Sequence, residues 1–305
     1  MHMLDKFRNF VAGAAGSLAL ALSGGVAAQE PVSAVEQARA TTGPALWQVK
    51  DDDTSIYLFG TVHALPPGMD WYDARIQSAF DASDEFVTEI DMADGAAMAQ
   101  TIASQAMLPA GTTLRSLMTE ENRIEYEKVL TDMNLPVSAL DPMEPWFAAM
   151  NLSLLPLLND GYSADSGVET SLTSRAQGKT RGALETIEQQ IALFDTLPME
   201  AQLTFLDGTV ESVPRAASTL NAMVAEWAEG DADQLAVLMN AELDDPELYK
   251  RLMTDRNANW ADWITARLEQ PGKVFIAVGA GHLAGEHSVQ QQLAKRGIEV
   301  TRIYE

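Results

Sequence analysis

The sequence predicts an α/β protein of the α+β kind, built on a mixed, partly parallel sheet with a large helical insertion. Three observations predict it. Apolar runs of strand length alternate with helical segments near both ends of the chain. Between them lies a long stretch in which apolar residues recur three and four positions apart. Two of the strand-like runs end in the same tetrapeptide, Gly-x-x-His, at residues 60–63 and 279–282.

The N-terminal elements are predicted to be two strands, a helix and a third strand. Two short apolar runs, residues 45–49 and 55–60, flank a run of three aspartates, and this pattern is typical of a β-hairpin. Residues 66–68, Pro-Pro-Gly, can continue neither a strand nor a helix. A helix is predicted near residues 72–80, and a strand over residues 85–91 that ends on an acid.

The middle of the chain is predicted to be helical, with one short strand. Residues 96–159 have the helical pattern, with Thr119 as an N-cap and Glu144-Pro145 as a helix start. The elements expected beyond it are a helix over 166–177, a strand over 179–184, helices over 188–270, a strand over 273–278, a helix over 288–296 and a strand over 299–303. An order of strands and helices of this kind favours a sheet whose strands are partly parallel.

Each Gly-x-x-His tetrapeptide begins with a glycine, Gly60 or Gly279. We expect the conformational freedom of this glycine to let the backbone turn sharply. Glycine reaches positive φ angles at little cost, so the chain would turn sharply there and approach a ligand closely. The imidazoles of His63 and His282 would then be presented at the end of a buried strand.

The first residues have the pattern of a cleaved secretory signal, residues 1–28. Lys6 and Arg8 precede an apolar stretch over residues 10–22, and small residues at 26–28 suit a signal peptidase. The apolar stretch is too short to span a bilayer comfortably. We therefore expect a periplasmic or secreted protein without stable membrane insertion after cleavage.

The rest of the chain, residues 29–305, is predicted to be a single domain, with its helical insertion at about 96–178 and 188–270. No Pro/Gly/Ser-rich linker interrupts the middle of the sequence. The chain has no cysteine, so neither a disulfide framework nor a lipid on cysteine is possible, and stability must come from an apolar core.

The net charge of −24 bears on partners and not on the fold. A surface this acidic repels nucleic acid and anionic lipid, and it raises the local concentration of cations. We therefore expect no nucleic-acid partner. The substrate, a peptide or a small molecule, is not identified by the charge.

Four residues that follow strand-like runs are the candidate site: His63, Glu89, Glu185 and His282. In sheets with parallel strands, ligands bind beyond the carboxyl ends of the strands, so these side chains are expected to meet along one edge. Neutral imidazoles and carboxylates suit a divalent metal. The same groups without metal suit general acid–base hydrolysis. Spacing does not decide between the two, because the sequence has neither an HExxH motif nor a close His-x-His pair.

Each candidate also has a plainer interpretation. An isolated loop histidine often bonds only to backbone, although the repeated tetrapeptide argues against this for His63 and His282. Glu89 could be an exposed strand-end acid, with Asp91 on the same strand face as a competitor. Glu185 could cap or pair with the helix that follows it.

Other polar residues also have both a functional and a purely structural interpretation. Glu169 is more often a first-turn helix acid favoured by the helix dipole than a site residue. Arg256, beside Asn257 on a predicted helix, could bind an oxyanion or a substrate carboxylate, or form a surface ion pair. His287 is expected to lie off the site, and the glycine loop before His282 lacks the spacing of a nucleotide-binding motif.

Taken together, these motifs resemble the TraB/GumN family, which includes the Tiki proteins. The resemblance covers nearly the whole predicted mature chain. The matching segments are Leu46-Trp47-Gln48-Val49, Leu58 to Pro66 with the first tetrapeptide, Glu89-Ile90-Asp91, Leu184-Glu185-Thr186 with Gln190, Arg256-Asn257, and Val278 to Leu283 with the second tetrapeptide.

The resemblance implies a fold like that of the erythromycin-esterase and haem-binding ChaN-like superfamily. For Tiki-like members it also implies a peptidase activity that needs Mn or Co. By position, His63 and His282 would be the motif histidines and Glu89 the strand-end acid. Glu185, Arg256 and Asn257 also match family positions, whereas many relatives are expected to have aspartate where this chain has Glu169.

The resulting prediction is an exported metal-dependent hydrolase, and specifically a peptidase. His63, His282 and Glu89 would hold a divalent ion (Mn, Co or Zn) that lowers the pKa of bound water. A second acid, with Glu185 as the candidate beside Glu89, would move a proton, and which glutamate has which role stays open. Arg256, with Asn257 beside it, would stabilise the oxyanion. Two alternatives remain: a non-catalytic binding protein for haem, metal or a peptide, and a metal-free hydrolase of the esterase type. The family spans pheromone shutdown, a polysaccharide-cluster protein and Wnt cleavage, so the resemblance does not identify the substrate.

Overall fold

A computed structural model of the chain describes residues 43–91, 100–102, 104–241 and 245–304. The predicted signal peptide, residues 1–28, lies outside the described residues. So do residues 96–99 and 103 of the predicted helical stretch. The division into one domain with a helical insertion stays a prediction.

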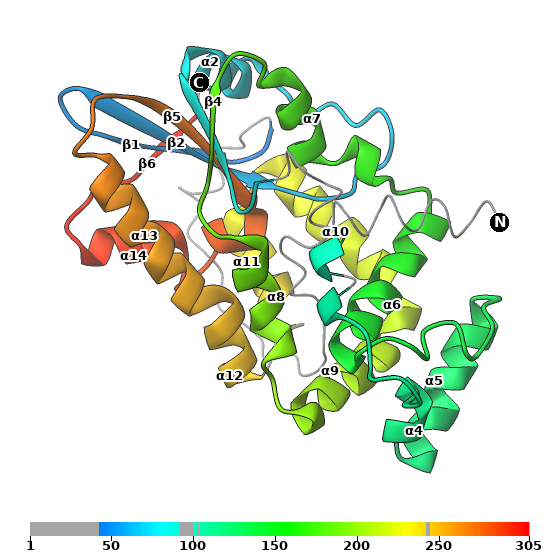
Figure 1. Ribbon diagram of the computed structural model, residues 1–305. Coiled ribbons are helices and arrows are strands. Elements are labelled where there is room, and N and C mark those ends of the chain that lie inside the picture. The colour runs from blue at the N-terminus through cyan, green and yellow to red at the C-terminus, as the bar shows by residue number, and fades with distance from the viewer. Residues whose placement is uncertain (1–42, 92–99, 103, 242–244, 305) are drawn as a thin grey trace, which may run out of the picture.

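The sheet has six strands in the order β4-β3-β5-β2-β1-β6 (Figure 1). The neighbours β4, β3, β5 and β2 are all parallel, whereas β1 is antiparallel to both β2 and β6. The predicted α/β class with a mixed, partly parallel sheet is thus confirmed. The strands are β1 (Leu46–Lys50), β2 (Thr54–Thr61), β3 (Glu85–Thr88), β4 (Thr180–Ala183), β5 (Gly272–Gly279) and β6 (Thr301–Ile303).

The helices gather mainly between β3 and β5 in the sequence, as predicted. They are α2 (Ala74–Ala82), α4 (Leu114–Leu117), α5 (Glu120–Asp132), α6 (Pro145–Asn159), α7 (Val168–Arg175), α8 (Ile187–Asp195), α9 (Met199–Ser212), α10 (Ala216–Glu229), α11 (Ala232–Asn240), α12 (Pro246–Tyr249), α13 (Asp255–Arg267) and α14 (Val289–Lys295). Short 3₁₀ turns are η1 (Ala164–Ser166), η2 (Val213–Arg215) and η4 (Ala280–Leu283), and η3 (Lys250–Thr254) is a π-helical turn.

Several local predictions are confirmed in detail. The β1–β2 hairpin turns on Asp51, whose side chain accepts the backbone N–H of Thr54 at 2.8 Å. The Thr119 hydroxyl caps α5 by accepting the backbone N–H of Asn122, and Pro145 occupies the first position of α6. The strand predicted over residues 85–91 is shorter than expected, so that Glu89 lies just beyond its end.

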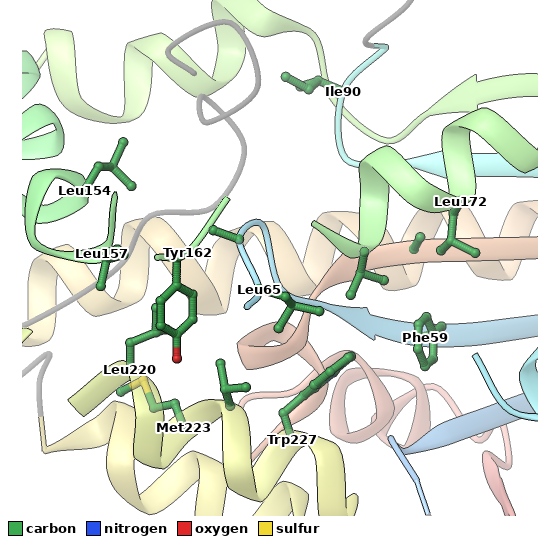
Figure 2. Close-up of a cluster of buried hydrophobic side chains, with 14 of the residues drawn as sticks. Phe59, Leu65, Ile90, Leu154, Leu157, Tyr162, Leu172, Leu220, Met223 and Trp227 are labelled. Atoms are coloured by element: carbon green, nitrogen blue, oxygen red, sulfur yellow. The ribbon is translucent and has the colours of Figure 1, made fainter. Parts of the chain in front are cut away.

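Both faces of the sheet are covered, which explains the unbroken apolar run of β5. On one face, Phe59, Phe86 and Phe275 pack with α2, α7 and α10. On the other face, Val274 and Ile276 pack against α13 and α14. Figure 2 shows part of the first cluster, with Phe59 on its strand close to side chains of the yellow helix α10.

A separate cluster of buried apolar side chains lies among the helices between β3 and β5. Residues of α4, α5, α6 and α9 form it, and in Figure 1 α4 and α5 lie far from the sheet. Helix α10 returns to the sheet, where the indole N–H of Trp227 donates to the carbonyl of Gly60 at 2.9 Å. This bond ties the helical middle to the first Gly-x-x-His loop.

The expected reason for the motif glycines is wrong. Neither Gly60 nor Gly279 has a positive φ angle. A Cβ on Gly60 would lie 2.9 Å from the Cα of Ala280, and a Cβ on Gly281 would overlap the methyl group of Met239. At Gly60, glycine is needed because its backbone packs directly against the backbone of Ala280 in the second loop, and not because the chain turns unusually.

Among the residues that the structure describes, no helix is both long enough and apolar enough to cross a membrane.

Replacement of Phe275 by alanine is expected to cost about 3–5 kcal/mol of unfolding free energy. This ring is fully buried at the centre of the sheet, 5.1 Å from the ring of Phe80 and 5.9 Å from that of Phe59. Urea unfolding of both variants measures the loss. The control Ile124→Ala, on a side chain that is 56% exposed, should change stability by less than about 0.5 kcal/mol. Equal losses in the two variants would contradict the assignment of the core.

Candidate active site

His63 lies two residues beyond the end of β2, and α7 positions its partner. The backbone N–H of Val168 donates to the carbonyl of Val62 at 3.0 Å, which brings the first turn of α7 against the loop. Gly167 permits this approach, because a Cβ there would overlap the carbonyl oxygen of His63. Glu169, in that first turn, therefore reaches the imidazole.

The Glu169 carboxylate holds His63 in one tautomer. Its Oε2 lies 2.5 Å from His63 Nδ1, and its Oε1 accepts the hydroxyl of Thr61 at 2.9 Å. An ionised carboxylate only accepts hydrogen bonds, so Nδ1 carries the proton, and in the neutral form of the ring Nε2 is the basic nitrogen. Glu169 does lie in a first helical turn, as expected, but its carboxylate is a buried partner of the motif histidine.

His282 lies in η4, directly after β5, and Asn257 of α13 orients it. The Asn257 amide N–H₂ donates to the carbonyl of His287 at 2.8 Å, so its Oδ1 faces His282 Nδ1 at 2.6 Å. Nδ1 therefore carries the proton. Nε2 accepts from Arg256 Nη1 at 3.0 Å, and the ring lies 4.3 Å from that of Trp260. Thus Asn257 and Arg256 together select the tautomer of His282.

His282 is neutral at physiological pH. Burial lowers its pKa to about 3, and the positive charge of Arg256 contributes in the same direction. Glu89 opposes the shift, and His63 adds to it, so the two motif histidines lie within electrostatic reach of each other.

Glu89 is buried just past β3, where three groups donate to it. The backbone N–H of Gly279 bonds Oε1 at 2.7 Å, while Arg256 Nη2 and Gln190 Nε2 bond Oε2 at 2.6 and 3.0 Å. Its Oε1 is 4.0 Å from His282 Nε2. The interpretation of Glu89 as an exposed strand-end acid is therefore excluded by its burial, whereas Asp91 is exposed.

Glu185 follows β4 and shares donors with Glu89. Arg256 Nε bonds Oε1 at 2.9 Å, and Arg256 Nη2 and Gln190 Nε2 bond Oε2 at 2.9 and 3.0 Å. The indole N–H of Trp260 donates to Oε1 at 2.9 Å. Glu185 is thus joined to the site by its hydrogen bonds with Arg256, Gln190 and Trp260, and it does not merely cap the next helix, whose cap is Thr186.

Arg256 is the hub of these contacts. Its five N–H groups face Glu185, Glu89, the Leu252 carbonyl and His282 Nε2, and its guanidinium lies 4.8 Å from the Trp260 ring centre. Burial opposes its charge, but Glu89 and Glu185 hold its pKa above the usual value. The surface ion-pair interpretation is wrong for this residue. Its N–H groups point at protein acceptors, so oxyanion binding would require it to leave them.

Five of the six predicted catalytic residues therefore form one connected network: Glu89, Glu185, Arg256, Asn257 and His282. His63 stands beside it in the pair with Glu169, and the pairing of Thr61 with Gly279 in the sheet places the two loops side by side. Sequence reasoning missed the contacts of Glu169 and of Trp260. Neither has a local signal, because both are ordinary helix residues whose partners lie far away in the chain.

The nitrogen and oxygen atoms of the predicted metal ligands are partly engaged in hydrogen bonds with the protein. Both imidazoles are anchored at Nδ1, as metal-binding histidines usually are. However, both oxygens of Glu89 accept N–H groups, and Arg256 Nη1 points at His282 Nε2. Within the described parts of the chain, no three metal-binding side chains stand close enough to hold an ion. As arranged, His63, His282 and Glu89 do not fit a divalent ion, and this ligand set stays a prediction.

The tautomer and charge of His282 can be tested by ¹⁵N NMR between pH 8 and pH 5. Because its pKa is lowered to about 3, Nε2 should remain unprotonated throughout, with Nδ1 protonated. The His282→Gln variant assigns the signal.

The same shift makes stability depend on pH. The imidazole of His282 binds a second proton near pH 6.5 in the unfolded state but not in the folded state, so His282 contributes stability above about pH 6.5 that is lost as pH falls toward 3. A midpoint near 6.5 in the folded protein would contradict the assignment.

Comparison with known proteins gives a consistent picture. The model of the TraB/PrgY/gumN family matches residues 45–302. The uncharacterized protein YbaP of Escherichia coli (strain K12) is 27% identical over 254 residues, which cover 83% of this chain and 92% of YbaP. An uncharacterized protein of Treponema pallidum (strain Nichols) is 25% identical, over 82% of this chain and 80% of its own length.

A second group of relatives has a named activity. Metalloprotease TIKI1 of Danio rerio is 26% identical over 309 residues, which cover 84% of this chain but 62% of TIKI1. Metalloprotease TIKI2 of the same species is 24% identical, with similar coverage. No solved structure matches the chain, so the expected likeness to the erythromycin-esterase fold stays a prediction. Because the family model spans nearly the whole described chain, this protein belongs to the TraB/PrgY/gumN family.

Proposed function

We propose that this protein is a hydrolase and that its substrates are peptides. The observation that carries the proposal is the 2.5 Å contact between His63 Nδ1 and the buried Glu169 carboxylate, beside a second, neutral imidazole. The similarity to the proteins named metalloproteases TIKI1 and TIKI2 supports the substrate class.

His63 is suited to act as the general base. With its Nδ1 proton directed at Glu169, its Nε2 can take a proton from water, and the carboxylate stabilises the imidazolium that results. The side chain of His63 is 14% exposed, compared with 2% for His282 and for Glu89. His63 is thus the more exposed of the two histidines, although its Nε2 atom is itself buried, and access of water to that atom is part of the proposal.

The proposed reaction needs no other proton carrier. Water oxygen attacks the peptide carbonyl carbon while His63 Nε2 takes its proton. The C–N bond of the tetrahedral intermediate then breaks, and the imidazolium returns the proton to the leaving amine. Arg256, Glu89, Glu185 and His282 hold the strand ends in place, and we assign Arg256 to that role and not to the oxyanion.

The metal-dependent form of the proposal is more specific. It takes His63, His282 and Glu89 as ligands for Mn, Co or Zn, and the names of the TIKI relatives support it. The contacts of Arg256 with Glu89 and His282 oppose it. No step of the scheme above uses a metal. Export through the predicted signal peptide is likewise proposed.

The test is digestion of a peptide library of varied sequence, with products identified by mass spectrometry. Protein treated with chelator is compared with protein supplied with Mn, Co or Zn. His63→Ala should lower the rate by about 10²–10⁴-fold, because general acid–base catalysis is lost. Glu169→Gln should lower it less and shift the pH profile. Glu188→Gln, an exposed acid on α8, is the matched control and should leave the rate unchanged.

The outcomes separate the alternatives. A rate unaffected by His63→Ala would place any hydrolysis elsewhere on the chain. Absence of products from every peptide would favour a binding role, and a Soret band on titration with haem would identify that ligand. Activity that survives chelation would favour the metal-free form.

A further inference from the structure

We infer that the Arg256 guanidinium occupies the place of a divalent cation between Glu89, Glu185 and His282, so that these three residues bind metal only when Arg256 leaves them. The inference deepens the proposed function, because it names both a different ligand set and the group that a metal must replace. Glu185 takes the place that the sequence assigned to His63.

The contacts of the guanidinium define the site. Nη2 lies 2.6 Å from Glu89 Oε2 and 2.9 Å from Glu185 Oε2, and Nη1 lies 3.0 Å from His282 Nε2. Imidazole nitrogen and carboxylate oxygen are both ligand types that zinc and other divalent ions accept. In this protein, the three side chains converge on the charged end of one arginine. A metal, at the shorter distance of about 2.0–2.2 Å, would require them to draw in once the guanidinium has gone.

The position of the guanidinium between Glu89, Glu185 and His282 favours a positive charge, because both carboxylates are buried. The side chain of Glu89 is 2% exposed, that of Arg256 6% and that of Glu185 11%. Removal of the guanidinium would leave two buried carboxylates without their positive partner, which is strongly unfavourable. A divalent ion restores the balance, and the His282 Nε2 lone pair, which now accepts from Arg256, becomes available as a ligand.

The backbone before Arg256 has an uncommon conformation. The π-helical turn η3 runs directly into α13, and the Leu252 carbonyl in it accepts from Arg256 Nη1 at 3.2 Å. Turns of this kind are rare and are found frequently at functional sites. Here the turn places Arg256 in the first turn of α13, where it reaches both carboxylates.

The experiment compares metal binding by full-length wild type and Arg256→Met after chelator treatment, using titration calorimetry with Mn²⁺ and Zn²⁺ and metal content by mass spectrometry. Arg256→Met should bind about one equivalent at least tenfold more tightly than wild type. Adding Glu185→Gln or His282→Gln to this variant should abolish the gain. Arg267→Met is the matched control, since Arg267 lies on the same helix and pairs with the single carboxylate of Glu85 at 2.9 Å. It should show no gain.

A folding defect does not obscure the result. If Arg256→Met unfolds without metal, its melting temperature should rise with metal concentration, because only the folded state has the site. Arg256→Lys, which keeps the charge on a single nitrogen, should show a smaller gain than Arg256→Met. No gain in either variant would overturn the inference.

The two proposals fail in different ways. If wild type already binds one equivalent tightly, and His63→Ala abolishes this while Glu185→Gln does not, the inference is wrong and the metal-dependent hydrolase stands. If Arg256→Met gains metal but His63→Ala keeps full peptidase activity, the inference stands and the proposed function is wrong.

Discussion

The ion pairs of Arg256 with Glu89 and Glu185 are the interaction on which the rest of the site depends. The three residues come from α13, from the end of β3 and from the end of β4. One guanidinium therefore links two parallel strands to the helix that covers one face of the sheet, and it fixes the imidazole of His282 as well. A buried charge cluster of this kind is weak evidence for stability, because desolvation offsets much of the attraction. Its value lies in orienting side chains.

The fold could be predicted well because its elements have strong local patterns. The hairpin of β1 and β2 has two apolar runs and an aspartate turn, and α5 and α6 begin at the residues that capping rules indicate. The sheet order could not be predicted, because it depends on which strands meet in space. Nor could the end of β3 at Thr88, which leaves Glu89 on the loop side of the sheet edge.

The candidate site was predictable as a set of residues but not as a set of contacts. Residues that follow parallel strands meet at one edge, so Glu89, Glu185 and His282 converge as expected. Glu169 was considered but not placed in the site, because a glutamate in a first helical turn is common, and only the close approach of Gly167 to His63 gives it a partner. The role of the motif glycines was misjudged for a related reason: a sequence shows that a side chain is missing but not what fills its place.

The parallel pairing of β2 with β5 has a consequence for biosynthesis. It joins Thr54 to Gly272 and Thr61 to Gly279, residues that the ribosome makes far apart in time. Pairing between such distant segments is slow, because a long loop must close first. His63 and Glu169 can come together on a growing chain, but strand β5, Arg256 and His282 are made later. The nascent protein therefore lacks a complete site until residues 256–282 have been made, and a product that ends before them would lack it altogether.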